Sequence, residues 1–234
     1  MVHGVINIRK EKGFTSHDVV AKLRGILGQK KIGHTGTLDP DATGVLPVCL
    51  GKATKLCDML TDKDKTYETV LLLGKATDTQ DISGTVLSEK AMDGIDNDAV
   101  ERCIGEFVGE YLQVPPMYSA LKVNGKKLYE LARAGIEVER KARPVVIYEI
   151  RIKDISLPRV RMEVSCSKGT YIRTLCHDIG EKLGCGGCME ELTRTKVSRF
   201  TLEDSYTLEE VRQKKEEGTL SEILVPIDEM FEQY

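Results

Sequence analysis

Two aspartates, Asp39 and Asp41, stand two residues apart in the glycine- and threonine-rich stretch KIGHTGTLDPDATGVLPV, residues 31–48. Carboxylates at this spacing could bind a metal ion, shape a turn around Pro40, or supply one reactive carboxylate. Each possibility makes different demands on the neighbouring residues, so the surrounding sequence can separate them.

The metal interpretation is tested by the calcium-binding EF-hand loop, whose first half DPDATG imitates. Asp39, Asp41 and Thr43 occupy the first, third and fifth ligand positions, and Gly44 occupies the sixth. The twelfth position has to be a bidentate glutamate, and here it is Leu50. The pattern therefore argues against a calcium site.

Two other chemistries also lack their residues. A phosphate-binding loop needs four residues between its glycine and its Gly-Lys pair, but six separate Gly44 from Gly51-Lys52, and Ala53 replaces Ser or Thr. A serine or cysteine nucleophile needs a partnered histidine, and the chain has four histidines and no nucleophile-elbow motif. A turn and a single reactive carboxylate both remain open, since Asp-Pro is also ordinary turn chemistry.

The segment before the loop is expected to be an amphipathic helix over residues 15–28. Ser16 is the expected N-cap and Gly28 the expected stop. The apolar residues recur at the spacing of one helical face, at Val19, Val20, Leu23, Ile26 and Leu27.

Elsewhere strands and helices interleave without a regular βαβ rhythm. We therefore expect an α+β fold with a mixed, largely antiparallel sheet flanked by helices. Residues 75–85 are expected to form a polar loop. The expected strands are 5–8, 45–50, 66–74, 159–169 and a segment after Pro144. The expected helices, besides 15–28, are 53–60, 97–109, 126–135, 170–184 and 207–218.

The composition is that of an ordinary soluble protein, with 234 residues, 30% charged and 41% hydrophobic. The N-terminus lacks the apolar run of a signal peptide, and no apolar stretch approaches a membrane span. We expect a cytoplasmic protein with no membrane partner.

The seven cysteines are an odd number without a secretion signal, so buried free thiols are expected rather than a disulfide framework. Cys185 and Cys188 in CGGC have the spacing of a metal-binding pair. A second pair or two nearby histidines would be needed for zinc, and neither is present. A glycine turn flanked by thiols is the expectation.

The net charge of −3 does not indicate nucleic-acid binding, but the charge is unevenly distributed. Residues 8–31 and 122–143 are rich in lysine and arginine, whereas acidic residues collect in 89–110 and 203–234. A local basic face is enough to follow a phosphate backbone, although such runs are also common on solvated helices.

The long motifs decide between the interpretations. Residues 31–56, KIGHTGTLDPDATGVLPVCLGKATKL, closely resemble the signature of bacterial TruB-type tRNA pseudouridine-55 synthases. The resemblance covers nearly the whole chain in order. It continues in DKTYETVLLLGKATDTQDISG, QVPPMYSALKVNGKKLYELARAGIEVERKARPV, VSCSKGTYIRTLCHDIGEKLG and ELTRTKVSRF.

The resemblance implies the pseudouridine synthase fold and a role for individual residues. Asp39 matches the catalytic aspartate, which acts on a uridine flipped out of the tRNA T loop. Tyr67 matches the tyrosine that stacks on the target base, and Tyr171 the tyrosine beside the ribose. Arg173 matches the arginine that pairs with the aspartate. On pattern alone the two tyrosines would be core residues and Arg173 a solvated helix residue.

The remaining matches concern substrate binding. His34 resembles the histidine that helps to hold the extruded base, and Leu192 a residue that closes the pocket. Residues 118–143 resemble a thumb-like RNA-binding insertion, whose basic residues would contact phosphates. Among these basic residues, Lys126, Lys127 and Arg143 are the ones expected to bind the substrate.

Physical chemistry supports these roles. An enzyme that alters a base's own glycosidic bond has to extrude that base and hold it against an aromatic or apolar face. A carboxylate has to be ionised to attack, and a nearby guanidinium favours the ionised form of Asp39 against burial. Arg173 is the expected partner.

The resemblance implies a tRNA pseudouridine synthase, an isomerase that needs no metal or cofactor, with the T arm of tRNA as partner and no obligate protein partner. We expect a single catalytic domain over 1–234, without the further C-terminal RNA-binding domain of many relatives. The alternatives are an RNA-binding or RNA-folding protein without turnover, and the same isomerisation on another RNA. Ser198 stands where the family usually has glycine, so we expect an altered turn there.

Overall fold

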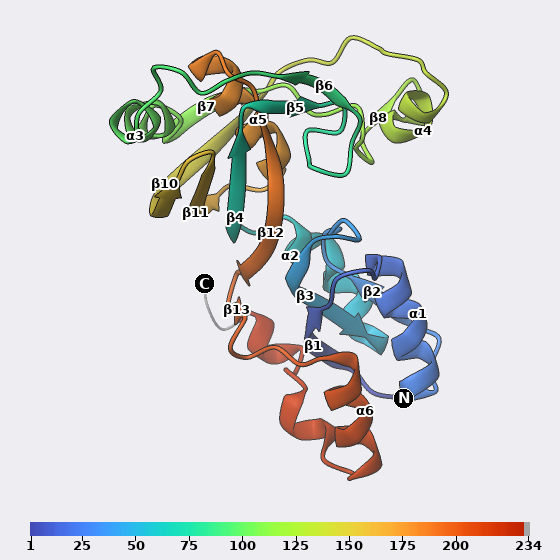
Figure 1. Cartoon of the computed structure of the whole chain (residues 1–234). Helices are drawn as coiled ribbons and strands as arrows, with labels where there is room; N and C mark the ends of the chain where they lie inside the picture. Colours follow the sequence, from blue (N-terminus) through green and yellow to red (C-terminus); the bar gives the residue numbers. More distant parts are fainter. Residues whose placement is uncertain (232–234) are drawn as a thin grey trace. The chain divides into compact units, whose positions relative to one another are not determined.

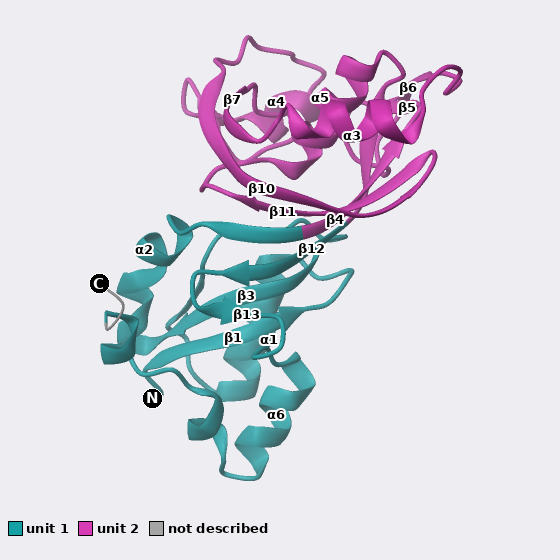
Figure 2. Ribbon diagram, turned by 90° about the vertical axis from the view of Figure 1, so that its left-hand side faces the viewer, with its two compact units in different colours: residues 1–67, 192–234 teal, residues 68–191 magenta. Residues whose placement is uncertain are grey.

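The structure, a computed structural model, describes residues 1–231 and divides into two compact units (Figure 2). Unit 1 comprises residues 1–67 and 192–234, and unit 2 comprises residues 68–191. Within the described part, no helix has the length and apolar character to cross a membrane.

The sheet of unit 1 is built around a central strand, β3 (Thr43–Leu50), which is buried along almost its whole length. Its antiparallel neighbour is paired from Gly4↔Leu50 to Lys10↔Gly44. The strand that carries Thr193 and Arg194 pairs with β3 in parallel, at Thr193↔Thr43 and Arg194↔Gly44. The other strands are β1 (Gly4–Lys10), β2 (Ile32–His34), β13 (Phe200–Thr201) and the C-terminal part of β12 (Gly187–Val197).

The expected first helix is confirmed as α1 (Ser16–Leu27), and all five of its predicted apolar residues are buried. Each such side chain contributes about 1.5–3 kcal/mol relative to remaining exposed. Gly28 ends the helix in the left-handed region, at φ 63°. The predicted cap at Ser16 is wrong. Thr15 is the N-cap, because Thr15 and Asp18 exchange side-chain and backbone hydrogen bonds in a capping box.

The other helical segments of unit 1 complete its core. The helix expected at 53–60 is corrected to a 3-10 helix, Gly51–Leu56, followed by α2 (Cys57–Thr61). The helix expected at 207–218 is confirmed as α6 (Leu208–Glu216), which contacts α1 and β1 (Figure 1). Two further 3-10 turns follow, Leu220–Ile223 and Asp228–Met230.

The sheet strands of unit 2 run in the order β4-β11-β10-β7, and β10 pairs antiparallel with both β11 and β7. The register of the long hairpin runs from Ile147↔Cys166 to Ser156↔Arg159. The polar loop expected at 75–85 is partly wrong, because Lys75–Thr77 pairs with a strand that begins at Val86. Its strands are β4 (Lys65–Leu73), β5 (Lys75–Thr77), β6 (Val86–Glu89), β7 (Gly109–Gln113), β8 (Lys122–Val123), β9 (Lys126–Lys127), β10 (Arg143–Ser156) and β11 (Arg159–Cys166).

The three helices expected in unit 2 are present but shorter than predicted, since residues 126–127 form β9 and residue 109 begins β7. Asp96 caps α3 by accepting from the backbone N–H of Ala99 at 2.8 Å. The helices are α3 (Asn97–Gly105), α4 (Leu128–Arg133) and α5 (Ile172–Leu183). Antiparallel pairs predominate in both units, so the α+β class with a mixed, largely antiparallel sheet is confirmed.

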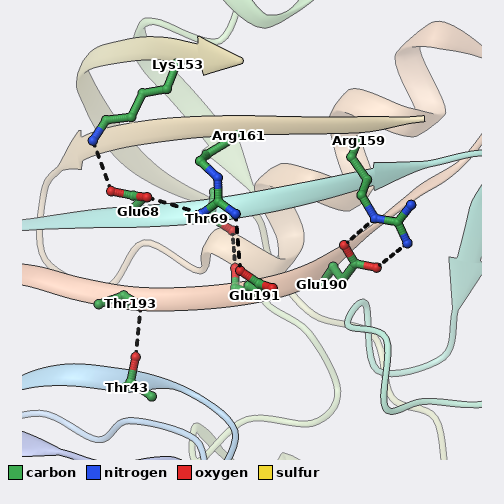
Figure 3. A network of polar contacts seen from close by, with 9 residues as sticks. All are labelled: Thr43, Glu68, Thr69, Lys153, Arg159, Arg161, Glu190, Glu191 and Thr193. Carbon is green, nitrogen blue, oxygen red and sulfur yellow. Dashed lines mark hydrogen bonds and ion pairs between the residues drawn. The ribbon is translucent and has the colours of Figure 1, made fainter. Parts of the chain in front are cut away.

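Ion pairs cover one surface of the sheet in unit 2 (Figure 3). Glu68 accepts from Lys153 at 3.0 Å and from Arg161 at 3.2 Å. Arg159 binds Glu190 through two hydrogen bonds of 2.8 Å. These side chains are partly or fully solvated, and exposed pairs of this kind contribute about 0–1 kcal/mol each. They stabilise the strand pairing modestly and do not form a buried reactive site.

Candidate active site

The loop that carries Asp39 joins β2 to β3 and contains a tight turn. The carbonyl oxygen of Asp39 accepts from the backbone N–H of Ala42 at 3.0 Å, and Pro40 and Asp41 lie at the turn's two central positions. Proline presets the φ angle that the second position of such a turn needs. Asp41 is exposed and Asp39 is half-buried. The turn therefore separates the two carboxylates into different environments.

Lys10, at the end of β1, binds the outer side of this turn. Its ammonium group is buried and donates to the carbonyl oxygens of Phe14 at 2.6 Å, Glu11 at 3.2 Å and Pro40 at 3.2 Å. Burial lowers the pKa of Lys10 to about 8, while the charges of Asp39 and Asp41 act in the opposite direction. A buried cation thus lies close to the predicted catalytic carboxylate.

Arg194, on β12, holds both arms of the same loop from inside the core. Its Nε donates to the carbonyl oxygen of Val45 at 2.8 Å, and its Nη2 donates to that of Gly36 at 3.3 Å. Burial lowers the pKa of Arg194, and a hydrogen bond with Tyr67 opposes that shift. The guanidinium therefore ties the loop to the tyrosine predicted to stack on the base.

Gly44 shows how closely β12 approaches the loop. Its φ of 107° lies in the region that side chains avoid, and a Cβ there would lie 2.2 Å from the carbonyl oxygen of Arg194. One strand position earlier, the hydroxyls of Thr43 and Thr193 are hydrogen-bonded at 2.9 Å (Figure 3). Leu192, the predicted pocket residue, is half-buried directly before Thr193.

His34 ends β2 at the start of the loop. Its ring meets the ring of His17 edge-on, with centroids 5.2 Å apart. Burial lowers the pKa of His34, and the nearby His17 and Arg194 lower it further. A neutral imidazole at neutral pH can accept as well as donate a hydrogen bond, which suits recognition of a base edge.

Two predicted catalytic residues lie in unit 2, at the start of α5. Tyr171 is the N-cap residue, with φ −96° and ψ 110°. Arg173 is buried and donates to the carbonyl oxygens of Tyr118 at 3.0 Å and Thr79 at 3.3 Å. The solvated-helix interpretation of Arg173 is therefore wrong. Its predicted pairing with Asp39 joins residues of different units and stays a prediction.

The three predicted phosphate-contacting residues lie on two strands of unit 2, β9 and β10. Lys126 and Lys127 form β9 of a small hairpin, whose turn residues Asn124 and Gly125 both have positive φ, at 51° and 79°. This is the turn chemistry of a tight hairpin. Arg143 is exposed at the start of β10.

The cysteines are free thiols in the described chain. Cys188 lies within β12 and Cys185 directly before the turn that leads into it, and both are buried. Burial raises the pKa of Cys188 to about 11, so this thiol stays protonated at neutral pH. Residues 1–231 contain no group of three or more potential metal ligands among His, Cys, Asp and Glu.

Comparison with known proteins decides the family. Residues 24–172 match the TruB family pseudouridylate synthase (N terminal domain), and residues 173–232 match the tRNA pseudouridylate synthase B C-terminal domain. The chain belongs to the TruB family. The resemblance seen in the sequence motifs is thereby confirmed.

Several TruB proteins are similar over nearly the whole chain. The tRNA pseudouridine synthase B of Lachnoclostridium phytofermentans is 58% identical, with 98% of this chain and 77% of that protein covered. The protein of the same name from Streptococcus pneumoniae is 51% identical, with 97% and 80% covered.

Solved structures confirm the pseudouridine synthase fold. A chain in the crystal structure of a Cbf5-Nop10-Gar1 complex is 34% identical with a TM-score of 0.77. The match covers 96% of this chain and 60% of that one. A chain of an H/ACA RNP bound to a substrate RNA containing 2'-deoxyuridine gives a TM-score of 0.73 at 31% identity, with 96% and 59% covered.

The departure from the TruB pattern at Ser198 has a structural correlate. Ser198 lies between β12 and β13 with φ 52°, the left-handed region that glycine adopts without strain. Its backbone N–H donates to the carbonyl oxygen of Asp64 at 3.3 Å, so the turn keeps its hydrogen bond. The serine therefore occupies a backbone conformation better suited to glycine.

Sequence reasoning missed Lys10 and Arg194. A lysine at the end of a short strand and an arginine in an alternating strand both suggest solvent exposure. The one available signal for Arg194 was its position inside the motif ELTRTKVSRF.

Proposed function

We propose that this TruB-family isomerase converts a uridine of the tRNA T loop to pseudouridine, with Asp39 as the carboxylate that acts on the extruded nucleotide. In this reaction the bond from the base N1 to the ribose C1′ breaks and a bond from C5 to C1′ forms. The C5 hydrogen leaves as a proton, and N1 takes up a proton in its place. The carboxylate can attack either the ribose or the base, and both reactions require Asp39 to be ionised.

The observation that carries the proposal is the way in which the Asp39 turn is held. Lys10 fixes the carbonyl of Pro40, and Arg194 fixes Gly36 and Val45 on the two arms of the loop. Two buried cations and a proline turn hold the backbone on both sides of the half-buried Asp39. Such preorganisation suits a nucleophile, and a protein that only binds RNA has no need for an ionised carboxylate beside an extruded base.

The other residues receive roles from their surroundings. Tyr67 is buried beside Arg194 and would offer its ring to the extruded base. His34, neutral at neutral pH, would accept or donate to the base edge, and Leu192 would close the pocket. Tyr171 and Arg173 would act on the ribose and on the carboxylate.

Residues 118–143 would act as the RNA-binding insertion. Lys126, Lys127 and Arg143 would contact phosphates of the T arm, and such contacts would make binding weaker at higher salt. The proposed partner is therefore tRNA. The chemistry assigned to these residues calls for no metal or cofactor.

The test is tritium release from a T-arm hairpin RNA that carries 5-tritiated uridine. Wild-type protein should release tritium, and Asp39→Asn should release none above background. Asp41→Asn is the matched control, because it removes the neighbouring exposed carboxylate from the same turn and should retain most activity. Hairpin binding by the wild type without tritium release would contradict the proposal.

A further inference from the structure

Gln113, the last residue of β7, holds the backbone of Tyr171 with both ends of its carboxamide. Its Oε1 accepts from the Tyr171 N–H at 2.8 Å, and its Nε2 donates to the Tyr171 carbonyl oxygen at 3.0 Å. The two residues are 58 positions apart in the chain, and Gln113 is buried. The carboxamide therefore makes the pair of backbone hydrogen bonds that a neighbouring strand would otherwise make to Tyr171.

The same carboxamide is part of a longer brace. Its Nε2 also lies 3.4 Å from the hydroxyl oxygen of Tyr111, which in turn donates a hydrogen bond to the carboxylate of Asp178 in the second turn of α5. Burial raises the pKa of Tyr111, and the hydrogen bond with Asp178 raises it further, so the phenol remains a donor. Strand β7 thus holds α5 at its N-cap residue, Tyr171, and again about two turns later, at Asp178.

A small cavity lies beside Tyr171, so this residue is not closely packed on every side. Gln113, Arg143 and Tyr171 line a cavity of about 50 Å³, which is room for ordered water. Tyr171 precedes the first helical residue, and no side chain caps the helix at that position. Because the cavity leaves space beside the Tyr171 backbone, the two hydrogen bonds from Gln113 help to define where the phenol and the first turn of α5 lie.

We propose that Gln113 is a positioning residue for the isomerisation, which fixes the backbone of Tyr171 and with it the start of the helix that carries Arg173. The inference rests on the proposed function of this site. Gln113 does not touch the reacting atoms, so its effect has to appear in the rate of the chemical step more than in RNA binding.

Two variants separate positioning from stability. Gln113→Met keeps the shape and loses both hydrogen bonds. Gln113→Glu keeps the acceptor for the Tyr171 N–H but loses the donor to the Tyr171 carbonyl unless the new carboxyl is protonated. The titratable groups around that carboxyl are Tyr111 on its own strand, Asp178 on α5 and Arg143 on β10.

The first measurement is the single-turnover rate on the T-arm hairpin between pH 6 and pH 8. Gln113→Met should be slower than the wild type by about 10²-fold at every pH, with hairpin affinity changed by less than about threefold. Gln113→Glu should be equally slow at pH 8, and its rate relative to the wild type should recover as the pH falls. A ratio for Gln113→Glu that is independent of pH, or wild-type rates in both variants, would overturn the inference.

The second measurement is amide hydrogen exchange of the Tyr171 N–H in the full chain. Exchange should be faster by about 10-fold or more in Gln113→Met and close to the wild type in Gln113→Glu, since only the latter keeps the acceptor. Equal protection in all three proteins would overturn the inference. If the wild type releases no tritium, the proposed function fails, and the exchange data alone decide whether Gln113 holds Tyr171.

Discussion

The ammonium group of Lys10 donates to the carbonyl oxygen of Pro40 over 3.2 Å, one residue beyond Asp39. The lysine is buried, and it also donates to the carbonyl of Phe14. The Lys10 ammonium group is thus buried away from water, and its hydrogen bonds hold the turn at Pro40. This arrangement makes Lys10 a determinant of the loop's geometry without placing it among the reacting groups.

Replacing Lys10 should therefore weaken the fold. Lys10→Met leaves the carbonyls of Phe14 and Pro40 without their buried donor, and we expect a loss of about 1–3 kcal/mol in the free energy of unfolding. Urea denaturation measures this change. Lys12→Met removes an exposed lysine nearby and should change the stability by less than about 0.5 kcal/mol. Equal effects of the two substitutions would contradict the assigned role of Lys10.

The pKa of Lys10 predicts a pH dependence of stability. Its pKa is about 8 in the folded protein and 10.5 as the ordinary value, so between these pH values the unfolded chain binds more protons. Stability should then rise with pH across this window, because the buried charge is lost in the folded state first. The stability of the wild type relative to Lys10→Met should increase by on the order of 1 kcal/mol from pH 7.5 to pH 9.5. A decrease over this range would show that the burial penalty has been assigned the wrong sign.

Arg194 should be irreplaceable even by lysine. Lys cannot reach both the Val45 and the Gly36 carbonyls in the fork geometry of a guanidinium. We expect Arg194→Lys to lower the free energy of unfolding by about 2 kcal/mol or more, since it disrupts a buried polar network. It should also reduce tritium release, because the Asp39 loop loses two supports.

Lys196→Met, two residues further along β12 at an exposed position, is the control for Arg194→Lys. Thermal or urea unfolding measured alongside the tritium assay would compare the two substitutions. Wild-type stability and activity in Arg194→Lys would show that the loop does not depend on the guanidinium.

Ser198→Gly should stabilise the protein. Serine at φ 52° bears backbone strain that glycine does not, but the greater freedom of glycine in the unfolded chain offsets part of the stability gained. We expect a net increase of about 0.5–1 kcal/mol in the free energy of unfolding. Ser198→Ala keeps the strain and should give no increase. A stabilised alanine variant would indicate that the hydroxyl, and not the backbone angle, is unfavourable.

The sequence predicted local structure well where the signal is local. The apolar face of α1 and the stop at Gly28 both follow from residue types at helical spacing. The short strand β5 was missed because its partner β6 lies on the other side of a loop, and three residues carry no periodicity. The true cap at Thr15 was missed by one residue, since Thr15 and Ser16 are both good capping residues.

The residues of the candidate site also differ in how far the sequence predicts them. Asp39 was found because its motif is long, and its role remains a prediction. Gln113 was not found, because its partner Tyr171 is distant in the chain and a glutamine at the end of a strand ordinarily suggests a solvated position. Burial of Lys10 and Arg173 likewise depends on which segments enclose them, and single-residue tendencies point the other way.

The division of the chain has a consequence for its synthesis. Unit 2 is continuous in sequence, whereas unit 1 combines residues 1–67 with residues from 192 onward. A ribosome releases all of unit 2 before it releases Thr193 and Arg194, which pair with Thr43 and Gly44 beside the Asp39 loop. The nascent chain can thus fold unit 2 early while that loop still lacks its inner support. The loop that carries the proposed catalytic carboxylate would therefore mature only after unit 2 has been synthesised.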